Sequence, residues 1–291
     1  MKALLITRGE HKATQLQTLT ALADKGIAAA AKHRHALQQA DQEHQACVEK
    51  ITSVLRGLPN LQLSIHKINS NTSCPDGAFD LVFAVGGDGT VLYANHALPS
   101  EQGLIVGVRS SRGSVGHLCA YDYRRLDLLA AAVQQNKFKA TSLQRLQALI
   151  TTAAHQEHTS AVLNDFLFAN SNPAATTRYM LNFRKQWETH KSSGIWVATA
   201  AGSSAALRAA GGKAMAITTN KLQFLVRELY QPLTSDMRSA EFDCEQDMFK
   251  IVSLCDAAML SLDGQYRMLT INYGDTIVFR PAPPLRISLA C

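Results

Sequence analysis

Short apolar runs alternate with stretches of helical periodicity over the first third of the chain. Apolar residues recur at helical spacing from Thr14 to about Ala23 and from about Ala28 to Leu58, which predicts two helices. Strand-like runs lie around them, at Ala3 to Thr7, Leu61 to Ile68, Asp80 to Val85 and Gly103 to Val108. Strands that alternate with helices predict a parallel sheet covered on both faces.

The pattern changes after about residue 120. From Tyr121 to the C-terminus the chain consists mainly of short β-like runs with turn residues between them, and no internal repeat is evident. Such spacing predicts a mainly β domain. We therefore expect an α/β domain over residues 1–120 and a mainly β domain over residues 121–291.

Composition agrees with a folded protein that binds small anions. The 291 residues are 46% hydrophobic and 18% charged, which is normal for one large or two ordinary domains with a buried core. The net charge of +6 comes from 29 basic and 23 acidic residues, without a Lys/Arg block that would follow a phosphate backbone. Anionic small molecules are therefore expected as partners, and nucleic acid is not.

Neither a membrane segment nor a metal or disulfide motif is expected. The apolar run from Ala3 to Ile6 is too short for a signal sequence and no later run has membrane-spanning length, so we predict a cytoplasmic protein. Six cysteines without a CxxC pair predict plain thiols. His33, His35 and His44 have mostly polar neighbours, which favours a solvated helix face over a metal site.

The candidate chemistry lies in a glycine-rich loop, Gly86-Gly87-Asp88-Gly89, between a predicted strand and a predicted helix. Glycines at that place let backbone N–H groups approach a phosphate. Asp88 would repel a phosphate, so it is better placed to accept a proton from a hydroxyl or to hold Mg²⁺. Phosphoryl transfer to an alcohol needs both a phosphate-binding backbone and an acid that accepts the hydroxyl proton or holds Mg²⁺. The alternative is a simple tight turn, since Asp-Gly favours turns in any protein.

The pentapeptide GGDGT, Gly86 to Thr90, resembles the nucleotide-binding loop of NAD kinases, diacylglycerol and sphingosine kinases, and more distantly 6-phosphofructokinases. Three further stretches resemble NAD kinases in particular, in order and spacing over nearly the whole chain from Asp80 onward. They are VLNDFLFAN (162–170), SSGIWVATAAGSSAALRAAGG (192–212) and LSLDGQ (260–265).

Within that family the chain is most similar to the plant-type NADH kinase branch, on GSVGHLCA (113–120), TAAGSSAALRAAGG (199–212) and LQFLVREL (222–229). Most bacterial NAD kinases carry Asp where this chain has Ser193, and Thr-Ala-Tyr where it has residues 204–206. A carboxylate near the nicotinamide would favour the cationic oxidised ring by on the order of 1–4 kcal/mol and would do nothing for the neutral reduced ring. Its loss suits NADH as substrate.

The resemblance implies a Rossmann-like α/β domain followed by a β-sandwich-like domain, as in NAD kinases and diacylglycerol kinases. It implies ATP-dependent phosphorylation of the adenosine-ribose 2′-hydroxyl of NAD⁺ or NADH, giving NADP⁺ or NADPH, with Mg²⁺ and assembly as a homodimer or larger homo-oligomer. A catalytically silent dinucleotide sensor and a lipid kinase remain alternatives. NAD⁺ against NADH and ATP against polyphosphate stay open.

The resemblance also assigns roles to residues of this chain. Asp88 would be the catalytic base, and no protein metal ligand is expected because the phosphates of ATP would hold Mg²⁺. Asp263-Gly264 is interpreted as a structural hairpin turn, and Arg109 either reaches a phosphate or, as we favour, faces solvent. The phosphate cradle would be Gly86, Gly87, Gly89 and Thr90, and the NAD(H)-binding residues would be Asn164, Asp165, Thr199, Ser203 and Ser204.

Overall fold

The structure is a computed structural model that describes residues 1–9, 13–68, 74–75, 77–97, 103–230, 237–243, 245–264 and 267–289. The chain divides into two compact units. The first comprises Met1–Thr141 with the segment from Arg286 onward, and the second comprises Ser142–Leu285. Two predicted features, the last residue of the Asp-Gly-Gln turn and the thiols of Cys244 and Cys291, lie outside the described residues.

The first unit is an α/β unit, as the alternation of strand and helix patterns predicted. Its elements in chain order are β1 (Lys2–Thr7), α1 (Ala13–Asp24), α2 (Ala28–Arg56), β2 (Gln62–Lys67), β3 (Leu81–Gly86), α3 (Asp88–Ala97), β4 (Leu104–Arg109), β5 (Tyr121–Asp122), the short 3₁₀ helix η1 (Tyr123–Arg125) and α4 (Leu126–Gln134).

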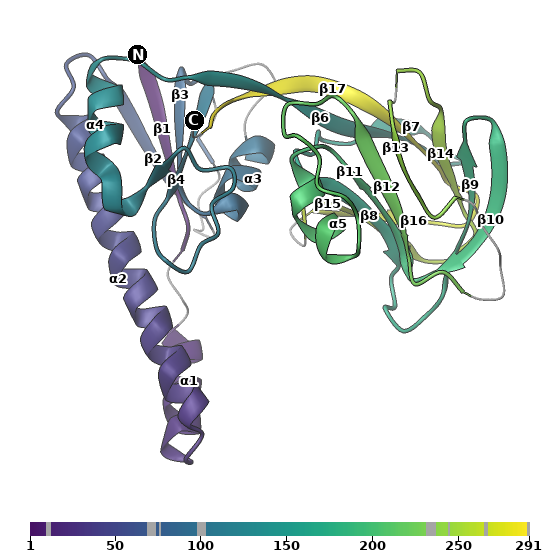
Figure 1. The fold of residues 1–291 in the computed structure, drawn as a ribbon, viewed down its shortest axis with the longest axis horizontal. Helices are drawn as coiled ribbons and strands as arrows, with labels where there is room; N and C mark the ends of the chain where they lie inside the picture. Colours follow the sequence, from purple (N-terminus) through teal and green to yellow (C-terminus); the bar gives the residue numbers. More distant parts are fainter. Residues whose placement is uncertain are drawn as a thin grey trace. The chain divides into compact units, whose positions relative to one another are not determined.

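Strands β2, β1, β3 and β4 lie side by side and parallel, in that order. Helices α2 and α4 cover one face of this sheet and α3 covers the other (Figure 1). On the α2 face, Ile51 and Leu55 pack with Phe83 and Val106 in one apolar cluster, which removes the alternate side chains of each strand from water. The predicted parallel sheet, covered on both faces, is confirmed.

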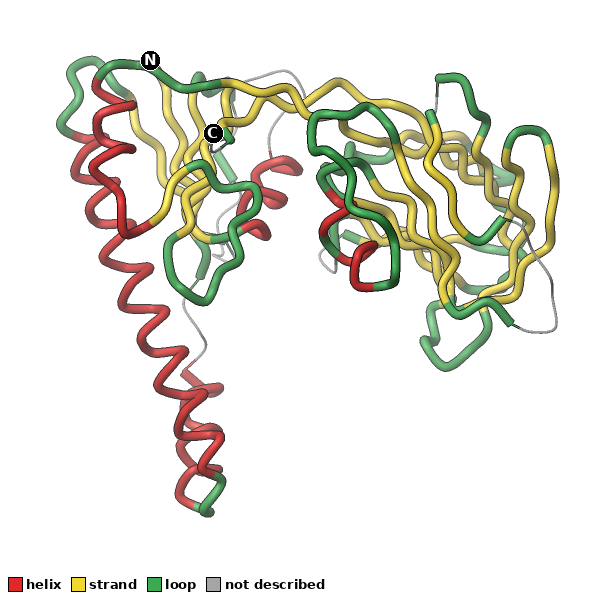
Figure 2. The backbone as a smooth tube through the Cα atoms, viewed as in Figure 1, coloured by secondary structure: helices red, strands yellow, loops and turns green. Residues whose placement is uncertain are grey.

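Helices α1 and α2 form an antiparallel pair (Figure 2). The reversal between them uses Gly26, whose φ of 84° lies in the left-handed region. The N–H of Gly26 donates to the carbonyl of Ala23 at 2.9 Å, and the N–H of Ile27 donates to Leu22 at 3.2 Å. These bonds satisfy carbonyls at the end of α1 and turn the chain into α2.

The predicted boundary at residues 120 and 121 lies earlier than the division seen in the structure. Strand β5 pairs with the end of β4, through Tyr121 with Val108 and Asp122 with Arg109. Leu129 of α4 then joins the apolar cluster of the first unit. These tertiary contacts, which follow residue 120 directly, hold the segment on the first unit.

The second unit is built almost entirely from antiparallel strands. Its elements are β6 (Ala140–Thr151), β7 (Gln156–His158), β8 (Asp165–Asn170), β9 (Thr177–Phe183), β10 (Gln186–Ser192), β11 (Gly194–Ala198), the 3₁₀ helix η2 (Gly202–Ser204), α5 (Ala206–Ala209), β12 (Leu222–Arg227), β13 (Ser239–Phe242), β14 (Phe249–Ser253), β15 (Ala258–Leu262), β16 (Met268–Ile271) and β17 (Thr276–Ser288).

These strands form two layers with an aromatic core. One layer runs β13-β12-β11-β8-β15-β16, and the other contains β10, β9, β14 and β17 in that order. Phe224 of the first layer lies 4.8 Å, centroid to centroid, from Phe249 of the second, and Phe166 lies 5.4 Å from Phe279. Aromatic rings at these separations carry much of a core's stability. The β-sandwich-like architecture is therefore confirmed.

Two further observations concern sequence predictions. Among the helices of the described residues, none is both long and apolar enough to cross a membrane. Within the same residues, Cys47, Cys119 and Cys255 form no disulfide. Burial raises the pKa of the Cys47 and Cys119 thiols to about 12, so neither thiol is a reactive nucleophile at neutral pH.

Candidate functional site

Strand β3 ends at Gly86, and α3 begins two residues later with Asp88 in its first turn. The N–H groups of Thr90 and Val91 donate to the carbonyl of Gly87 at 2.9 and 3.3 Å and close the turn. A helix N-terminus leaves backbone N–H groups without an intrahelical acceptor, and these groups favour an anion. Asp88 and Gly89, predicted as loop, are therefore the beginning of the helix.

The glycines of this turn differ in what surrounds them. A methyl group on Gly86 would collide with the side chain of Thr90, and one on Gly87 would lie 3.0 Å from the side chain of Ser114. A methyl group on Gly89 would meet no atom within 4 Å. Close packing thus requires Gly86 and leaves little room at Gly87, whereas Gly89 leaves exposed backbone that a ligand can approach. Thr90 itself is buried, with its N–H engaged inside the turn.

The Asp88 carboxylate is fixed by two backbone hydrogen bonds. Its oxygens accept the N–H of His117 at 3.1 Å and the N–H of Leu118 at 2.8 Å. Both donors belong to residues 113–120, a stretch that the sequence analysis used only for its resemblance. An ionised carboxylate offers about four lone-pair positions, so capacity remains for the hydroxyl group of a ligand.

A buried chain of polar side chains leads to the carbonyl of Gly86. The hydroxyl of Thr7 lies 2.9 Å from Nε2 of His44, and Nδ1 of His44 lies 2.7 Å from the hydroxyl of Ser110. Ser110 in turn donates its hydroxyl to the Gly86 carbonyl at 3.2 Å and its N–H at 2.9 Å. Burial, with the positive charge of Arg8, lowers the pKa of His44 to about 4, so the ring is neutral at pH 7.

The prediction that His44 lies on a solvated helix face was wrong. His33 and His35 are exposed, but His44 is only 2% exposed. Its position in α2 falls in the buried stripe that also contains Ala40 and Cys47. Because these residues are three and four positions away, the helical period gives the signal that could have identified His44 as buried.

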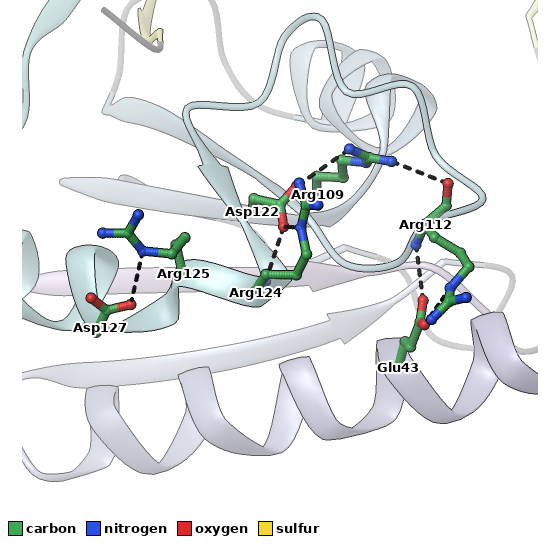
Figure 3. A network of polar contacts seen from close by, with 7 residues as sticks. All are labelled: Glu43, Arg109, Arg112, Asp122, Arg124, Arg125 and Asp127. Atoms are coloured by element: carbon green, nitrogen blue, oxygen red, sulfur yellow. Dashed lines mark hydrogen bonds and ion pairs between the residues drawn. The ribbon is translucent and has the colours of Figure 1, made fainter.

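Arg109, at the end of β4, is partly buried and is held by two polar contacts. Its guanidinium pairs with Asp122 at 3.3 Å and donates to the backbone carbonyl of Arg112 at 3.1 Å (Figure 3). A methyl group on Gly116 would lie 3.1 Å from the Arg109 side chain, so the chain wraps closely around it. The expectation that Arg109 faces solvent holds only in part, because Asp122 and the loop after β4 hold a side chain that is 27% exposed.

Figure 3 shows that the same loop is also attached to α2. Glu43 accepts two hydrogen bonds from Arg112, from its backbone N–H at 2.9 Å and from Nε at 2.7 Å. This contact raises the pKa of the Arg112 guanidinium, and hydrogen bonds from Arg124 lower the pKa of Asp122. Loop residues 110–118 are thus held by carboxylates at Glu43, at Asp122 through Arg109, and at Asp88.

In the second unit, Asp263 organises the Asn-Asp segment. Its carboxylate accepts three backbone N–H groups, from Leu163 at 2.9 Å, Asn164 at 2.7 Å and Asp165 at 3.2 Å. Asp263 has a φ of 50°, a left-handed conformation that Asp tolerates better than most residues. The interpretation as a hairpin turn between β15 and β16 is correct but incomplete, since this turn also caps the start of β8.

Asp165 is a buried acid with an unusual titration. It is 5% exposed, and burial together with the negative charge of Asp263 raises its pKa to about 7. Within the described part of the chain no side chain or N–H group donates a hydrogen bond to its carboxyl group. An acid in this state can donate or accept a proton near neutral pH.

Asn164 lies beside a close backbone contact. Its side-chain oxygen is buried, and no hydrogen-bond partner is present among the described residues. A methyl group on Gly202 would collide with the backbone carbonyl of Asn164, and the N–H of Thr199 donates to the same carbonyl at 2.8 Å. The Thr199 hydroxyl donates to the carbonyl of Leu163. The structure thus brings together three sequence motifs, the Asn-Asp pair, the Gly-Ser turn and Asp263.

The two serines of the Gly-Ser turn have different surroundings. Ser203 is fully buried, and its hydroxyl donates to the carbonyl of Ala200 at 2.6 Å and accepts the N–H of Met215 at 2.8 Å. Ser204 is exposed, and its hydroxyl makes a long contact of 3.4 Å with Ala201. Ser203 therefore serves the turn itself, and Ser204 has the accessible hydroxyl.

A scan against protein-family models found no match. Comparison with curated proteins found related kinases. The chain is 29% identical to a probable NADH kinase of Oryza sativa subsp. japonica over 272 residues, which cover 84% of this chain and 81% of the relative. It is 30% identical over 253 residues to the NAD kinase of Pseudomonas fluorescens strain Pf-5, covering 84% of this chain and 79% of that protein.

Solved structures with a similar fold are also NAD kinases. The yeast NADH kinase complexed with NADH aligns with a TM-score of 0.74 at 14% identity, covering 100% of this chain and 84% of that chain. An NAD kinase from Archaeoglobus fulgidus in complex with ATP aligns with a TM-score of 0.68 at 16% identity, covering 99% and 93%. At these identities the structures establish the fold.

Proposed function

The chain belongs to the NAD kinase family, and from this premise we propose that it transfers the γ-phosphoryl group of ATP to the 2′-hydroxyl of the adenosine ribose of NAD⁺ or NADH. It is therefore a kinase, and its products are NADP⁺ or NADPH. The observation that carries the proposal is the Asp88 carboxylate, held by two backbone N–H groups beside a helix N-terminus. A fixed base beside an anion site is what phosphorylation of a hydroxyl requires.

In the first unit, Asp88 would accept the proton of the 2′-hydroxyl as that oxygen attacks the γ-phosphorus. Its two hydrogen bonds leave lone pairs for the incoming hydroxyl and restrict rotation of the carboxylate, so little reorganisation is needed in the transition state. Exposed backbone at Gly89 and the turn at Gly86 and Gly87 would bind phosphate oxygens. The buried Thr90 would stabilise this turn, since its N–H donates to the carbonyl of Gly87.

In the second unit, Asn164 and Asp165 would bind the dinucleotide. The unpartnered oxygen of Asn164 can accept a hydrogen bond from a ribose hydroxyl or an adenine amino group. Asp165 would accept such a hydrogen bond when ionised. The exposed hydroxyl of Ser204 would contact the adenosine half, and the buried Thr199 and Ser203 would hold the turn that presents it.

Mg²⁺ is proposed as part of the donor substrate MgATP. Among the described residues, no group of three His, Cys, Asp or Glu side chains could hold a metal ion. The ion would enter on the triphosphate and neutralise its charge, while the protein binds the phosphate oxygens. We also propose a homodimer or larger homo-oligomer, from the family resemblance, and a cytoplasmic location, because the reaction draws on cellular ATP and NAD(H).

The reduced dinucleotide is the proposed preferred substrate. The residue before Gly194 is Ser193, a half-buried residue whose N–H donates to the carbonyl of Arg227 at 3.1 Å. Most bacterial NAD kinases, by the resemblance described above, carry an aspartate at this position. Its carboxylate would favour the cationic ring of NAD⁺. A serine removes that preference, in agreement with the similarity to NADH kinases of plants.

The purified protein should be assayed with ATP and Mg²⁺ and either NAD⁺ or NADH, with product detected by an enzyme cycle specific for NADP(H). Turnover of either dinucleotide supports the kinase, and faster turnover of NADH supports the substrate preference. Binding of NADH without any product would instead identify a catalytically silent sensor. Polyphosphate in place of ATP, and diacylglycerol in place of the dinucleotide, complete the comparison of donors and acceptors.

A further inference from the structure

Helix α2 holds the loop that fixes the Asp88 carboxylate. Two consecutive residues of this helix contact the loop: Glu43 accepts two hydrogen bonds from Arg112, and His44 lies 2.7 Å from the hydroxyl of Ser110. The same loop ends in the two N–H groups that bind Asp88. Asp88 is thus held through a protein segment whose other end is attached to α2.

The contacts of His44 suit a neutral imidazole ring that makes a hydrogen bond at each of its two nitrogens. If Nδ1 carries the proton, Thr7 donates to Nε2, Nδ1 donates to Ser110, and Ser110 donates to the carbonyl of Gly86. Every donor in this chain then has an acceptor. His44 and Thr7 are 2% and 7% exposed and Ser110 is fully buried, so water cannot replace a lost partner without rearrangement.

This series of hydrogen bonds is connected to Asp88 by two routes. Gly86 carries the turn that precedes Asp88, and Ser110 opens the loop that ends at Leu118, so His44 is linked to the backbone of Asp88 and to its side-chain partners. Asp41, one turn earlier in α2, pairs with Arg8 at 2.9 Å and so attaches the end of β1 to the same helix. No other histidine of α2 is buried.

We propose that Glu43 and His44 are positioning residues for phosphoryl transfer, which act through the loop Ser110–Leu118 on the orientation of Asp88 and touch no substrate themselves. This inference rests on the proposed kinase activity and on the role of Asp88. Displacement of a catalytic group by about 1 Å can cost about 100-fold in rate, and loss of a supporting residue commonly costs about 10-fold or more.

A double-mutant cycle in the full-length chain tests the inference. His44→Leu and Glu43→Gln are each expected to lower kcat about 10-fold or more, with KM for the dinucleotide within about twofold of wild type. In the Asp88→Asn background the same substitutions should have almost no further effect, because their route to the rate has been removed. His35→Leu, an exposed histidine of the same helix, should leave kcat unchanged.

Equal fold-loss of kcat in both backgrounds would mean that the substitutions act independently of Asp88, and that result overturns the inference, as does full activity of both single variants. If His44→Leu does not fold, Ser110→Ala and Glu43→Gln carry the cycle, since each removes only polar contacts. An inactive wild-type protein rejects the proposed function itself, and a fully active Asp88→Asn variant rejects the role of Asp88. An active wild type with a failed cycle rejects only the inference.

Discussion

Asp263 binds the backbone N–H of Asn164 at 2.7 Å, although 99 residues separate them in sequence. The same carboxylate accepts the N–H groups of both neighbouring residues, so a single turn residue sets the position of the Asn-Asp pair. The side-chain oxygen of Asn164, which has no partner within the described residues, is thereby held in one place. Pre-organisation of this kind lowers the entropy that a ligand must remove when it binds.

Asp263→Asn is expected to weaken dinucleotide binding. Asparagine tolerates the left-handed backbone of residue 263 but presents only one acceptor oxygen, and its NH₂ group faces an N–H group that it cannot satisfy. We expect KM for the dinucleotide to rise about 10-fold and the free energy of unfolding to fall by about 1–3 kcal/mol. Steady-state kinetics and thermal unfolding measure the two effects.

Asp256→Asn is the matched control, because Asp256 is an exposed aspartate two residues before β15. It should leave KM for the dinucleotide unchanged and should change the free energy of unfolding by no more than about 0.5 kcal/mol. Equal effects of the two substitutions would contradict the anchoring role of Asp263.

Asp165 should give stability a pH dependence of known sign. Its folded pKa of about 7 lies above the unfolded value of 3.8, so the native state binds the proton more tightly. That contribution is complete below about pH 4 and is lost as pH rises through about 7. The free energy of unfolding of Asp165→Asn minus that of wild type should therefore increase between pH 4 and 7, by at most about 1.4 kcal/mol per pH unit, and stay level above.

The measurement is denaturant unfolding of both proteins at several pH values from 4.5 to 8. His44, whose pKa is lowered to about 4, contributes in the opposite direction over the acidic part of this range. That contribution is present in both proteins and cancels in the difference. A difference that does not change with pH would mean that Asp165 titrates as an ordinary surface aspartate.

Local patterns were enough to predict most of the elements. The predicted helix from about Ala28 to Leu58 is α2, Ala28–Arg56, because its apolar stripe and its helix-forming residues agree with its packing. The strands around it were found for the same reason. The domain boundary was predicted too early, since the pairing of Tyr121 with Val108 is a tertiary contact that leaves no periodic signal.

The candidate site was only partly predictable from the sequence. Asp88 stands out by itself, as an acid between glycines at a helix start. Its partner Leu118 is 30 residues away, and the partner of His44, Ser110, is 66 residues away. Hydrogen bonds between such distant residues depend on how the strands are ordered, and neither residue type nor spacing encodes that order locally.

Alanine substitutions of Gly86 and Gly89 should distinguish a glycine needed for packing from a glycine needed for ligand binding. Gly86→Ala is expected to lower the melting temperature, because the new methyl group collides with Thr90. Gly89→Ala meets open space in the first turn of α3, so its stability should equal or exceed that of wild type by up to about 1 kcal/mol.

If exposed backbone at Gly89 binds phosphate, Gly89→Ala should raise KM for ATP at unchanged stability. Thermal unfolding and ATP titrations of both variants provide the test. An unaltered KM for ATP would mean that the exposed backbone of Gly89 does not bind phosphate.

Asp88→Asn is expected to lower kcat by about 100-fold or more while leaving KM for the dinucleotide nearly unchanged. The substitution removes the base that would take the 2′-hydroxyl proton. It keeps one acceptor oxygen for the two backbone N–H groups and places its NH₂ group opposite the other. Asp127→Asn, at an aspartate whose side chain is 65% exposed in α4, is the control and should keep wild-type rates. A kcat close to wild type in Asp88→Asn would require another residue as the base.

Ser193→Asp should shift the substrate preference toward NAD⁺. The oxidised nicotinamide ring is cationic and the reduced ring is neutral, so a carboxylate beside the ring attracts only the first. With an interaction of on the order of 1–4 kcal/mol, the ratio of kcat/KM for NAD⁺ to kcat/KM for NADH should rise about 10-fold or more. Ser193→Asn has nearly the same size without the charge and should leave the ratio near its wild-type value. If both substitutions change the ratio equally, the effect comes from side-chain volume and the charge argument for NADH preference fails.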